Sequence, residues 1–470
     1  MKCFLISPDY PQKHALLLPV PPQGLAYVGA VLKSLGHQVE AEDQFASGRS
    51  NEDLVRRVMD FSPDLVGIGC LTPTMSNSAE LSRLLRKRGF QGVLIMGGVH
   101  PTLFYQSILD EGLADVVVLG ESEKTLPELM SAIENHAPLE SVAGLAFRDQ
   151  NGLVVKTKDR PQNRNLDDLP YPAWHLFDLA RYSSAPLLAL YGLALPVQAS
   201  RGCPERCTFC GQEIFYPKMA FRSIPSVLGE IDELVDRYKM KYFVFVDANF
   251  PPSKKYGLDF CAAFTKSRHW PKVKWCCEIK VDMVDEELLR AMKEAGCHLI
   301  EYGLEVGDSK ILKSLKKRTT LEDGIRAMNI TRKVGIHTLG LFMIGLPGEG
   351  VREIIRTFRF ARKIRCDMAK FNIAIPQPGS ELFRRHQDRL LADFHPQTYS
   401  SWYRPGKGEP PMTTLPGGLP VKLLQRLQTL GMLWFYARPG FIFRQLRQGT
   451  LPLKDMVRGA GFLLSEALKL

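Results

Sequence analysis

Three cysteines lie close together in the stretch SRGCPERCTFCGQ: Cys203, Cys207 and Cys210. Cysteine thiolates bind zinc or iron–sulfur clusters, and a closed structural zinc site takes four protein ligands. The next cysteine along the chain is Cys261, and no histidine lies near the three. Three thiolates can instead hold an iron–sulfur cluster and leave one iron open to another ligand. The spacing therefore favours a cluster with one open coordination position.

The composition is that of an ordinary globular protein with several domains. Its 470 residues exceed what one compact core usually organises, so two or three domains are expected. No run of about 18 apolar residues predicts a membrane span. Pro8 interrupts the first apolar run too early for a signal peptide. We therefore expect a cytoplasmic location, where the ten cysteines are ligands or reduced thiols rather than disulfides.

The chain is basic, with a formal net charge of +11 and an isoelectric point of about 9.1. Such a charge suits nucleic acid, an anionic membrane surface, an acidic redox partner or an anionic substrate. The sequence has no zinc-finger spacing and no RNA-recognition signature, so a nucleic-acid partner is not expected. A basic surface without a dedicated role is the simplest alternative.

The first part of the chain, residues 1–135, alternates short apolar runs with amphipathic stretches. The apolar runs predict strands over residues 2–7, 37–43, 64–70, 92–98 and 115–121. Strands that alternate with helices indicate a doubly wound, Rossmann-like parallel sheet, which binds ligands at the carboxyl ends of its strands.

The rest of the chain divides into three further parts. Residues 136–194 are charged and proline-rich and predict a connector with a β-hairpin near Gly152. Residues 195–385 predict six strands alternating with helices, which suits an open, partial (β/α) barrel with its chemistry at the strand carboxyl ends. Residues 386–470 form a basic helical region, interpreted as a packed cap, a lid over an apolar substrate or a membrane-surface helix.

The cysteine triplet follows the first predicted barrel strand, and Phe209 precedes the last cysteine. This C-x3-C-x2-C pattern resembles the radical S-adenosylmethionine (SAM) superfamily. The resemblance implies a 4Fe–4S cluster on Cys203, Cys207 and Cys210, with SAM on the open iron and a 5′-deoxyadenosyl radical as its product. Turn formation and helix capping are the structural alternatives for the matching strand-end residues. The resemblance implies SAM contacts at Phe209, Asp247, Gly303, Glu305, Gly345 and Pro347.

The amino-terminal part has small residues at its strand ends and no G-x-G-x-x-G after its first strand. This pattern resembles the cobalamin-binding Rossmann domains, in which the first loop reads D-x-H-x-x-G. Gly24 matches the last glycine of that loop, and Pro21 takes the place of the cobalt-binding histidine. The resemblance implies cobalamin with no imidazole from this loop; a degenerate domain is the alternative. It implies cobalamin contacts at Pro21, Gly24, Leu71, Thr72, Gly97, Gly98, Gly120 and Glu121.

The two domains in this order resemble the cobalamin-dependent radical SAM enzymes of the class B methyltransferase type. The resemblance implies methylation of an unactivated carbon or phosphorus centre by way of methylcobalamin and a 5′-deoxyadenosyl radical. A radical cyclase of the anaerobic tetrapyrrole type and a non-catalytic cobalamin sensor are the alternatives. The implied partners are a small-molecule substrate and an electron donor such as flavodoxin or ferredoxin. Peripheral membrane contact through residues 386–470 stays open, and the sequence names neither the substrate nor a catalytic residue.

Overall fold

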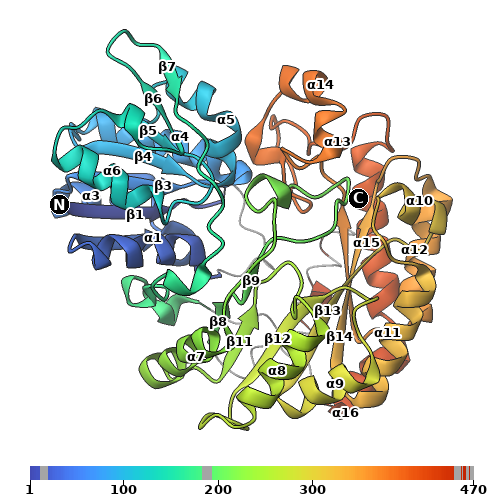
Figure 1. The fold of residues 1–470 in the computed structure, drawn as a ribbon. Helices are drawn as coiled ribbons and strands as arrows, with labels where there is room; N and C mark the ends of the chain where they lie inside the picture. Colours follow the sequence, from blue (N-terminus) through green and yellow to red (C-terminus); the bar gives the residue numbers. More distant parts are fainter. Residues whose placement is uncertain (11–19, 183–192, 449–456, 458, 462–464, 466–470) are drawn as a thin grey trace.

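The computed structural model describes residues 1–10, 20–182 and 193–448, together with residues 457, 459–461 and 465. Two sheets, each covered by helices, lie side by side in it, the first in blue and teal and the second from green to orange (Figure 1). In the described part, no helix is long and apolar enough to cross a membrane.

The first sheet has a parallel core in the order β2-β1-β3-β4-β5. Its strands are β1 (Lys2–Ser7), β2 (Gln38–Asp43), β3 (Leu65–Gly69), β4 (Val93–Gly97) and β5 (Val116–Val118). Its helices are α1 (Gln23–Ser34), α3 (Asn51–Phe61), α4 (Met75–Lys87), α5 (Val99–Asp110) and α6 (Thr125–Glu134). The strands are apolar on both faces because both faces are covered. In β1, Leu5 packs on the α1 and α6 side, and Phe4 packs on the side of α3, α4 and α5.

A hairpin from the predicted connector extends this sheet. Strand β6 (Leu145–Arg148) pairs antiparallel with β5, and β7 (Val154–Lys156) pairs with β6. The hairpin lies beyond β5 at the far edge of the sheet (Figure 1). The predicted hairpin is confirmed, but it belongs to the first sheet because Phe147 pairs with Val116 there.

The second sheet is an open barrel of six parallel strands in sequential order. Its strands are β8 (Ala194–Val197), β11 (Tyr242–Phe245), β12 (Lys274–Ile279), β13 (Cys297–Glu305), β14 (His337–Ile344) and β15 (Met368–Ile373). Its outer helices are α7 (Ile224–Tyr238), α8 (Lys254–Phe264), α9 (Glu286–Glu294), α11 (Leu321–Val334) and α12 (Val351–Lys363). They ring the outside of the strands in Figure 1. The predicted partial barrel is confirmed.

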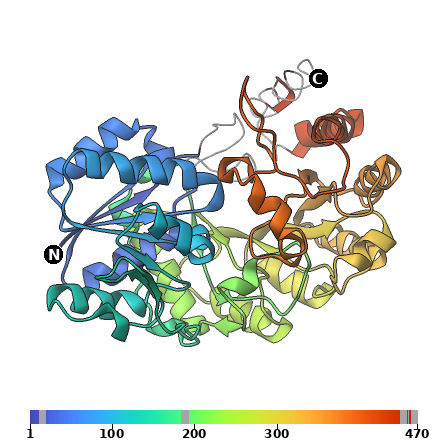
Figure 2. The ribbon, with the colours of Figure 1, turned by 90° about the horizontal axis from the view of Figure 1, so that it is seen from above.

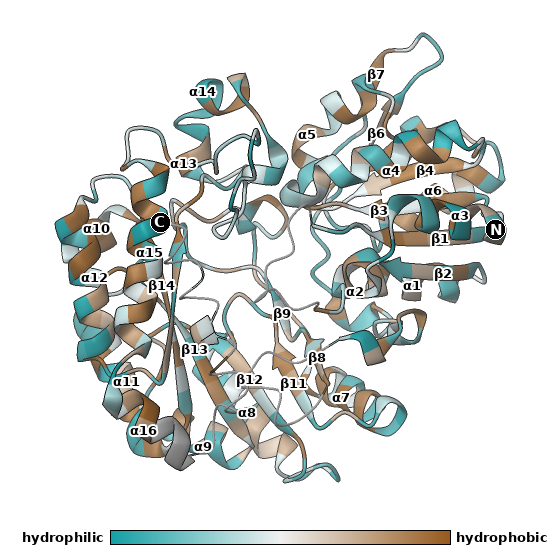
Figure 3. Cartoon of the chain, turned by 180° about the vertical axis from the view of Figure 1, so that it is seen from behind, coloured by the Kyte–Doolittle hydropathy of each residue, from teal (hydrophilic) through white to brown (hydrophobic). Residues whose placement is uncertain are grey.

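Side chains alternate between the two faces of this second sheet. Phe243, Trp275 and Tyr302 point outward into the main core beneath the helices. Cys276 and Leu299 instead belong to a small separate cluster on the inner face. Figure 3 shows that several strands of this sheet are hydrophobic and that the helices around them are mixed in character. The bottom of the barrel interior is therefore apolar.

The carboxy-terminal region closes the barrel edge, as the cap interpretation predicted. Helix α15 (Val421–Tyr436) packs on β15 and α12. The Gln428 amide donates to the Phe371 carbonyl at 2.8 Å, so the edge strand β15 is covered rather than exposed. The segment before α15 also reaches the first module, where Phe394 lies 5.0 Å from Phe104 of α5 between ring centroids. Figure 2 shows this orange segment beside the blue module.

Candidate functional site

The cysteine loop is held at its base by a short antiparallel ribbon. Strand β9 (Ser200–Arg201) pairs with β10 (Ala220–Phe221), and the three cysteines lie on the loop between them. Gly202 adopts a φ of 94°, and a Cβ atom there would come within 2.4 Å of the Lys218 carbonyl oxygen. Only glycine fits a position that needs both a left-handed backbone and this close approach. The loop is therefore built on one obligatory glycine.

The three cysteines line one cavity of about 190 Å³. All three are free thiols; Cys203 and Cys207 are half-buried and Cys210 is exposed. Within the described ranges, no three Cys, His, Asp or Glu side chains meet at the distances of a single metal ion. A cubane cluster spreads its thiolates over separate iron ions and needs a wider arrangement. Burial raises the pKa of the Cys207 thiol to about 12, so ligation of iron there releases a proton. Three free thiols on one cavity wall fit a 4Fe–4S cluster.

The end of β13 is held by a buried lysine. Lys317 Nζ donates to Glu305 Oε1 at 2.6 Å and to the Gly303 carbonyl oxygen at 2.7 Å. Glu305 has a φ of 59°, which is costly for a residue other than glycine. Lys317 and Glu305 also act electrostatically on Cys207. The structure thus brings the predicted Gly303 and Glu305 to the cysteine loop and adds Lys317, which sequence reasoning missed.

Two glutamates on the barrel interior were also missed. Glu278 of β12 and Glu301 of β13 are register partners on neighbouring strands. Burial and the charges of Glu301 and Glu305 raise the pKa of Glu278 to about 7, and burial raises that of Glu301. Neither carboxylate has a hydrogen bond or ion pair to the described residues. The signal was a glutamate inside an apolar strand at an inward-facing position, next to Cys276 and Leu299.

Asp247 supports the cysteine loop from below. It is buried at the end of β11, where its carboxylate accepts hydrogen bonds from the Ser200 hydroxyl at 2.5 Å and the Ala199 amide at 3.1 Å. Burial raises its pKa to about 7. Both oxygens thus hold the chain that enters the loop, and a SAM contact for Asp247 stays a prediction.

The turn after β14 packs against the carboxy-terminal helix. Gly345 has a φ of 83°, and a Cβ atom there would lie 2.9 Å from Leu424 of α15. The carboxylate of Glu349 accepts a hydrogen bond from the Leu346 amide at 2.9 Å, and Pro347 is exposed. Gly345 and Pro347 therefore stand at the predicted strand end, and their SAM contacts stay predictions. Phe209 packs against an apolar cluster that includes Val306, Leu312 and Leu382.

A second, larger cavity of about 410 Å³ opens at the carboxyl ends of the first sheet. Six of the eight predicted cobalamin contacts line it: Gly24, Leu71, Gly97, Gly98, Gly120 and Glu121. Pro21 is buried and adjoins the lining residue Pro22. Thr72 turns inward, is buried, and lies 3.3 Å from His100 Nδ1. Neither Pro21 nor Thr72 lines the cavity.

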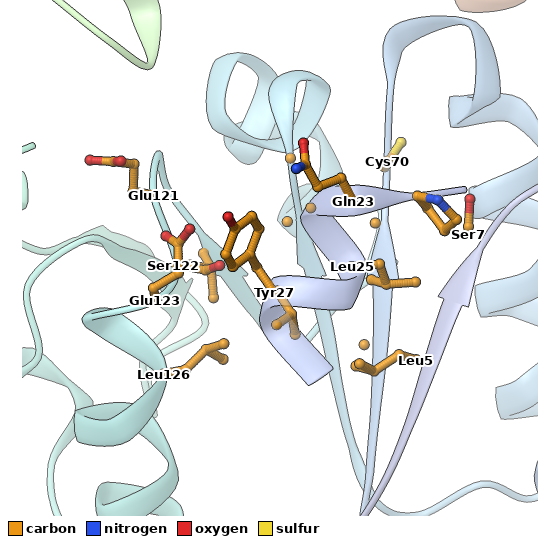
Figure 4. Close-up of a pocket in the computed structure, with 18 of the residues that line it drawn as sticks. Leu5, Ser7, Gln23, Leu25, Tyr27, Cys70, Glu121, Ser122, Glu123 and Leu126 are labelled. Carbon is orange, nitrogen blue, oxygen red and sulfur yellow. The ribbon is translucent and has the colours of Figure 1, made fainter. Parts of the chain in front are cut away.

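The walls of this cavity fit a large and partly apolar group. One side consists of apolar chains such as Leu5 and Leu25, and Glu121 and Glu123 stand on the loop opposite, with Tyr27 between (Figure 4). A Cβ atom on Gly98 would come within 2.7 Å of the Cys70 carbonyl oxygen, so backbone forms part of the wall. The described lining contains no histidine. These residues fit cobalamin, and the described residues of the loop before α1 would supply no histidine ligand to its cobalt.

Two family models match parts of the chain that form these two cavities. Residues 197–361 match the radical SAM superfamily, and residues 15–130 match the B12 binding domain. An uncharacterized methyltransferase from Pyrococcus horikoshii is 29% identical over 100% of this chain and 97% of its own. The anaerobic magnesium-protoporphyrin IX monomethyl ester cyclase of Cereibacter sphaeroides is 29% identical over 83% of this chain and 64% of its own.

A solved structure shares the fold of both modules. The radical SAM methyltransferase TsrM from Kitasatospora setae, determined with cobalamin and a [4Fe-4S] cluster, superimposes with a TM-score of 0.72. It covers 93% of this chain and 89% of its own at 18% identity, which shows the fold alone. The radical SAM domain implies a 4Fe–4S cluster and SAM, and the B12 binding domain implies cobalamin. The chain therefore combines an amino-terminal B12 binding domain with a radical SAM domain that follows it.

Proposed function

We propose that this protein is a cobalamin-dependent radical SAM methyltransferase that methylates an unactivated carbon or phosphorus centre of a small molecule. One observation carries the proposal: Tyr216 lines both the cavity at the first sheet and the cavity of the three cysteines. Two cofactors bound in these cavities would be neighbours. The relative from Pyrococcus horikoshii, which is named a methyltransferase, supports this reaction.

The chain's own residues position the cofactors and keep water out. When bound, the cluster and SAM supply a 5′-deoxyadenosyl radical, and cobalamin carries the methyl group. Cys203, Cys207 and Cys210 would hold the cluster. Lys317 holds the Glu305 carboxylate in place through a buried ion pair at the end of β13. The substrate is expected in the barrel interior, above its apolar floor.

An electron donor and a membrane surface are further proposed partners. The net charge of +11 supports docking of an acidic donor such as flavodoxin or ferredoxin. Helix α16 (Pro439–Gln448) exposes Ile442 and Phe443, which supports peripheral contact with a membrane. Residues 449–470, which follow this helix, lie largely outside the described residues.

A radical cyclase is the second candidate, because the Cereibacter sphaeroides cyclase has the same 29% identity as the Pyrococcus horikoshii methyltransferase, although over 83% rather than 100% of this chain. Product analysis distinguishes the two. The reconstituted protein is incubated anaerobically with SAM, cobalamin and a chemical reductant. Methyl transfer predicts S-adenosylhomocysteine that forms only when cobalamin is present. Formation of 5′-deoxyadenosine without S-adenosylhomocysteine would contradict methyl transfer and favour the cyclase.

The third interpretation, a non-catalytic cobalamin sensor, predicts that no cluster assembles. Reconstitution with iron and sulfide gives the test, since thiolate-bound clusters absorb at about 400 nm. The proposed enzyme gains this absorbance and cleaves SAM. Cobalamin binding without any cluster absorbance would favour the sensor.

A further inference from the structure

The two cavities share a wall. Tyr216 lines both of them, and its neighbour Phe215 lines the larger one. A short helical turn after the last cysteine sets their position, with the Tyr216 amide donating to the Gln212 carbonyl at 3.1 Å. The Tyr216 hydroxyl has no hydrogen bond to the described residues. The ring, rather than its hydroxyl, is therefore the structural partition between the cavities.

Arg201 holds the Tyr216 ring in place. Its guanidinium carbon lies 5.6 Å from the centroid of the Tyr216 ring and 5.6 Å from that of Tyr27. Arg201 Nη1 donates to Glu121 Oε1 at 2.5 Å, and Nη2 donates to Glu123 Oε1 at 2.6 Å. The Arg201 side chain is 3% exposed and the two glutamates are 8% exposed. One arginine thus joins the loop after β5 to the ring between the cavities.

The two ion pairs and the ring contact made at position 201 together require arginine. A planar guanidinium can donate to two carboxylates and stack on an aromatic ring at once, whereas a lysine ammonium is a point charge on a flexible stem. Arg201, Glu121 and Glu123 place two carboxylates against one cation in a buried site, an arrangement that contributes little net stability. Their role is therefore to fix the positions of the loop after β5 and of the Tyr216 ring. Arg201 also stands two residues before Cys203, at the start of the cysteine loop.

We propose that Arg201 is a positioning residue that couples the two cavities, so that a ligand bound in one raises the affinity of the other. This inference rests on the proposed function, because it assigns cobalamin to the larger cavity and the cluster to the smaller one. Glu121 and Glu123 line the larger cavity, and Arg201 links them to the Tyr216 ring beside the cysteines. A ligand in one cavity that stabilises the position of this linked group also stabilises it for a ligand in the other, which makes the two binding events mutually favourable.

The test compares cobalamin affinity in two states of the full-length protein. Hydroxocobalamin is titrated into protein with a reconstituted cluster and SAM, and into protein free of iron. In the wild type we expect the Kd to be at least about fivefold lower in the loaded state. In Arg201→Lys the two Kd values become equal within about twofold. Equal values in the wild type, or an unchanged ratio in folded Arg201→Lys, would overturn the proposal.

Arg222 offers a matched control. It is a buried arginine paired with Glu230, its guanidinium lies 5.5 Å from the Tyr171 ring, and it lines neither cavity. Arg222→Lys is expected to keep the wild-type ratio of Kd values. Loss of the ratio in this variant as well would indicate general damage and contradict a specific role for Arg201.

A second pair of variants keeps the test decisive if Arg201→Lys does not fold. Tyr216→Phe retains the ring and is expected to retain the ratio, whereas Tyr216→Leu removes the ring and is expected to abolish it. An equal ratio in both would overturn the proposal. Its failure differs from failure of the proposed function: normal binding of iron and cobalamin without coupling contradicts only this inference. Absence of iron or cobalamin binding in the wild type contradicts the proposed function itself.

Discussion

Lys317 Nζ lies 2.6 Å from Glu305 Oε1, and both side chains are almost completely buried at the end of β13. Removal of one partner of such a pair leaves an uncompensated charge in a site of low polarity. We predict that Lys317→Met lowers the free energy of unfolding by about 3 kcal/mol. We also predict at least a tenfold loss of SAM affinity, of the order expected for a loss of about 1.4 kcal/mol. Urea unfolding and equilibrium dialysis of the reconstituted protein measure the two effects.

Lys333 provides the control for this prediction. It pairs with Glu286 on the surface, and neither residue lines the cavity of the three cysteines. Exposed ion pairs contribute about 0–1 kcal/mol, so Lys333→Met is expected to leave both quantities nearly unchanged. Equal behaviour of the two variants would show that the buried pair does not hold the site.

Gly202 tests the construction of the cysteine loop. In Gly202→Ala the new Cβ atom would clash with the Lys218 carbonyl oxygen at a left-handed backbone position. We expect the loop to shift and the bound iron to fall to less than half of the wild-type amount. Gly408→Ala is the control, because Gly408 also has a positive φ but has open space around it. Iron analysis after reconstitution separates the clash from backbone strain, and full iron content in Gly202→Ala would contradict the account.

Gly97 tests the assignment of the larger cavity. It lines that cavity without a positive φ, and a Cβ atom there would meet nothing closer than 3.8 Å. Gly97→Leu therefore fills the cavity without straining the backbone. We predict at least a tenfold weaker affinity for hydroxocobalamin in iron-free protein, with normal cluster assembly after reconstitution. Unchanged cobalamin affinity would place cobalamin elsewhere.

Glu278 predicts a pH dependence of stability. Its pKa is raised from the ordinary 4.5 to about 7, so the folded state favours the protonated carboxyl. The stability that the folded state gains from binding this proton is complete below about pH 4.5 and is lost as the pH rises through about 7. We predict that Glu278→Gln raises the free energy of unfolding by about 1–2 kcal/mol at pH 8 and changes it little at pH 4.5. Urea unfolding at both pH values is the measurement.

The exposed Glu80 on α4 gives the comparison for this pH experiment. Glu80→Gln should shift stability by no more than about 0.5 kcal/mol at either pH, as surface substitutions usually do. If Glu278→Gln follows the same pattern, its carboxylate is not destabilised by burial.

Much of the fold follows from local patterns in the sequence. Alternation of apolar runs and amphipathic stretches predicted the parallel strands of both sheets, because burial on both faces leaves a continuous apolar signature. The partner of the hairpin was not predictable in this way. Pairing of Phe147 with Val116 depends on which strand edge is free, and that is a property of the assembled sheet. Helix α8 has only a weak local signal, since a glycine and aromatic residues weaken its helical pattern.

The candidate site was likewise predictable only in part. The cysteine spacing and the glycines at strand ends are local signals, and they indicated both cavities. Arg201 and Glu121 are 80 residues apart in the chain and meet only when the two modules assemble. Lys317 belongs to the basic run KSLKKR, which resembles an ordinary surface segment until β13 places Glu305 beside it. Partners that meet only through tertiary structure leave no signature in a single sequence.

Transfer of an isotopically labelled methyl group tests the central claim most directly. The protein with its reconstituted cluster is incubated anaerobically with reduced cobalamin and SAM that has a trideuterated methyl group, and Cys207→Ala serves as the control. The account predicts that the label is recovered on cobalamin together with S-adenosylhomocysteine, and that the wild type, but not Cys207→Ala, also forms 5′-deoxyadenosine. Unlabelled cobalamin, with 5′-deoxyadenosine as the sole SAM-derived product, would contradict the methyltransferase assignment.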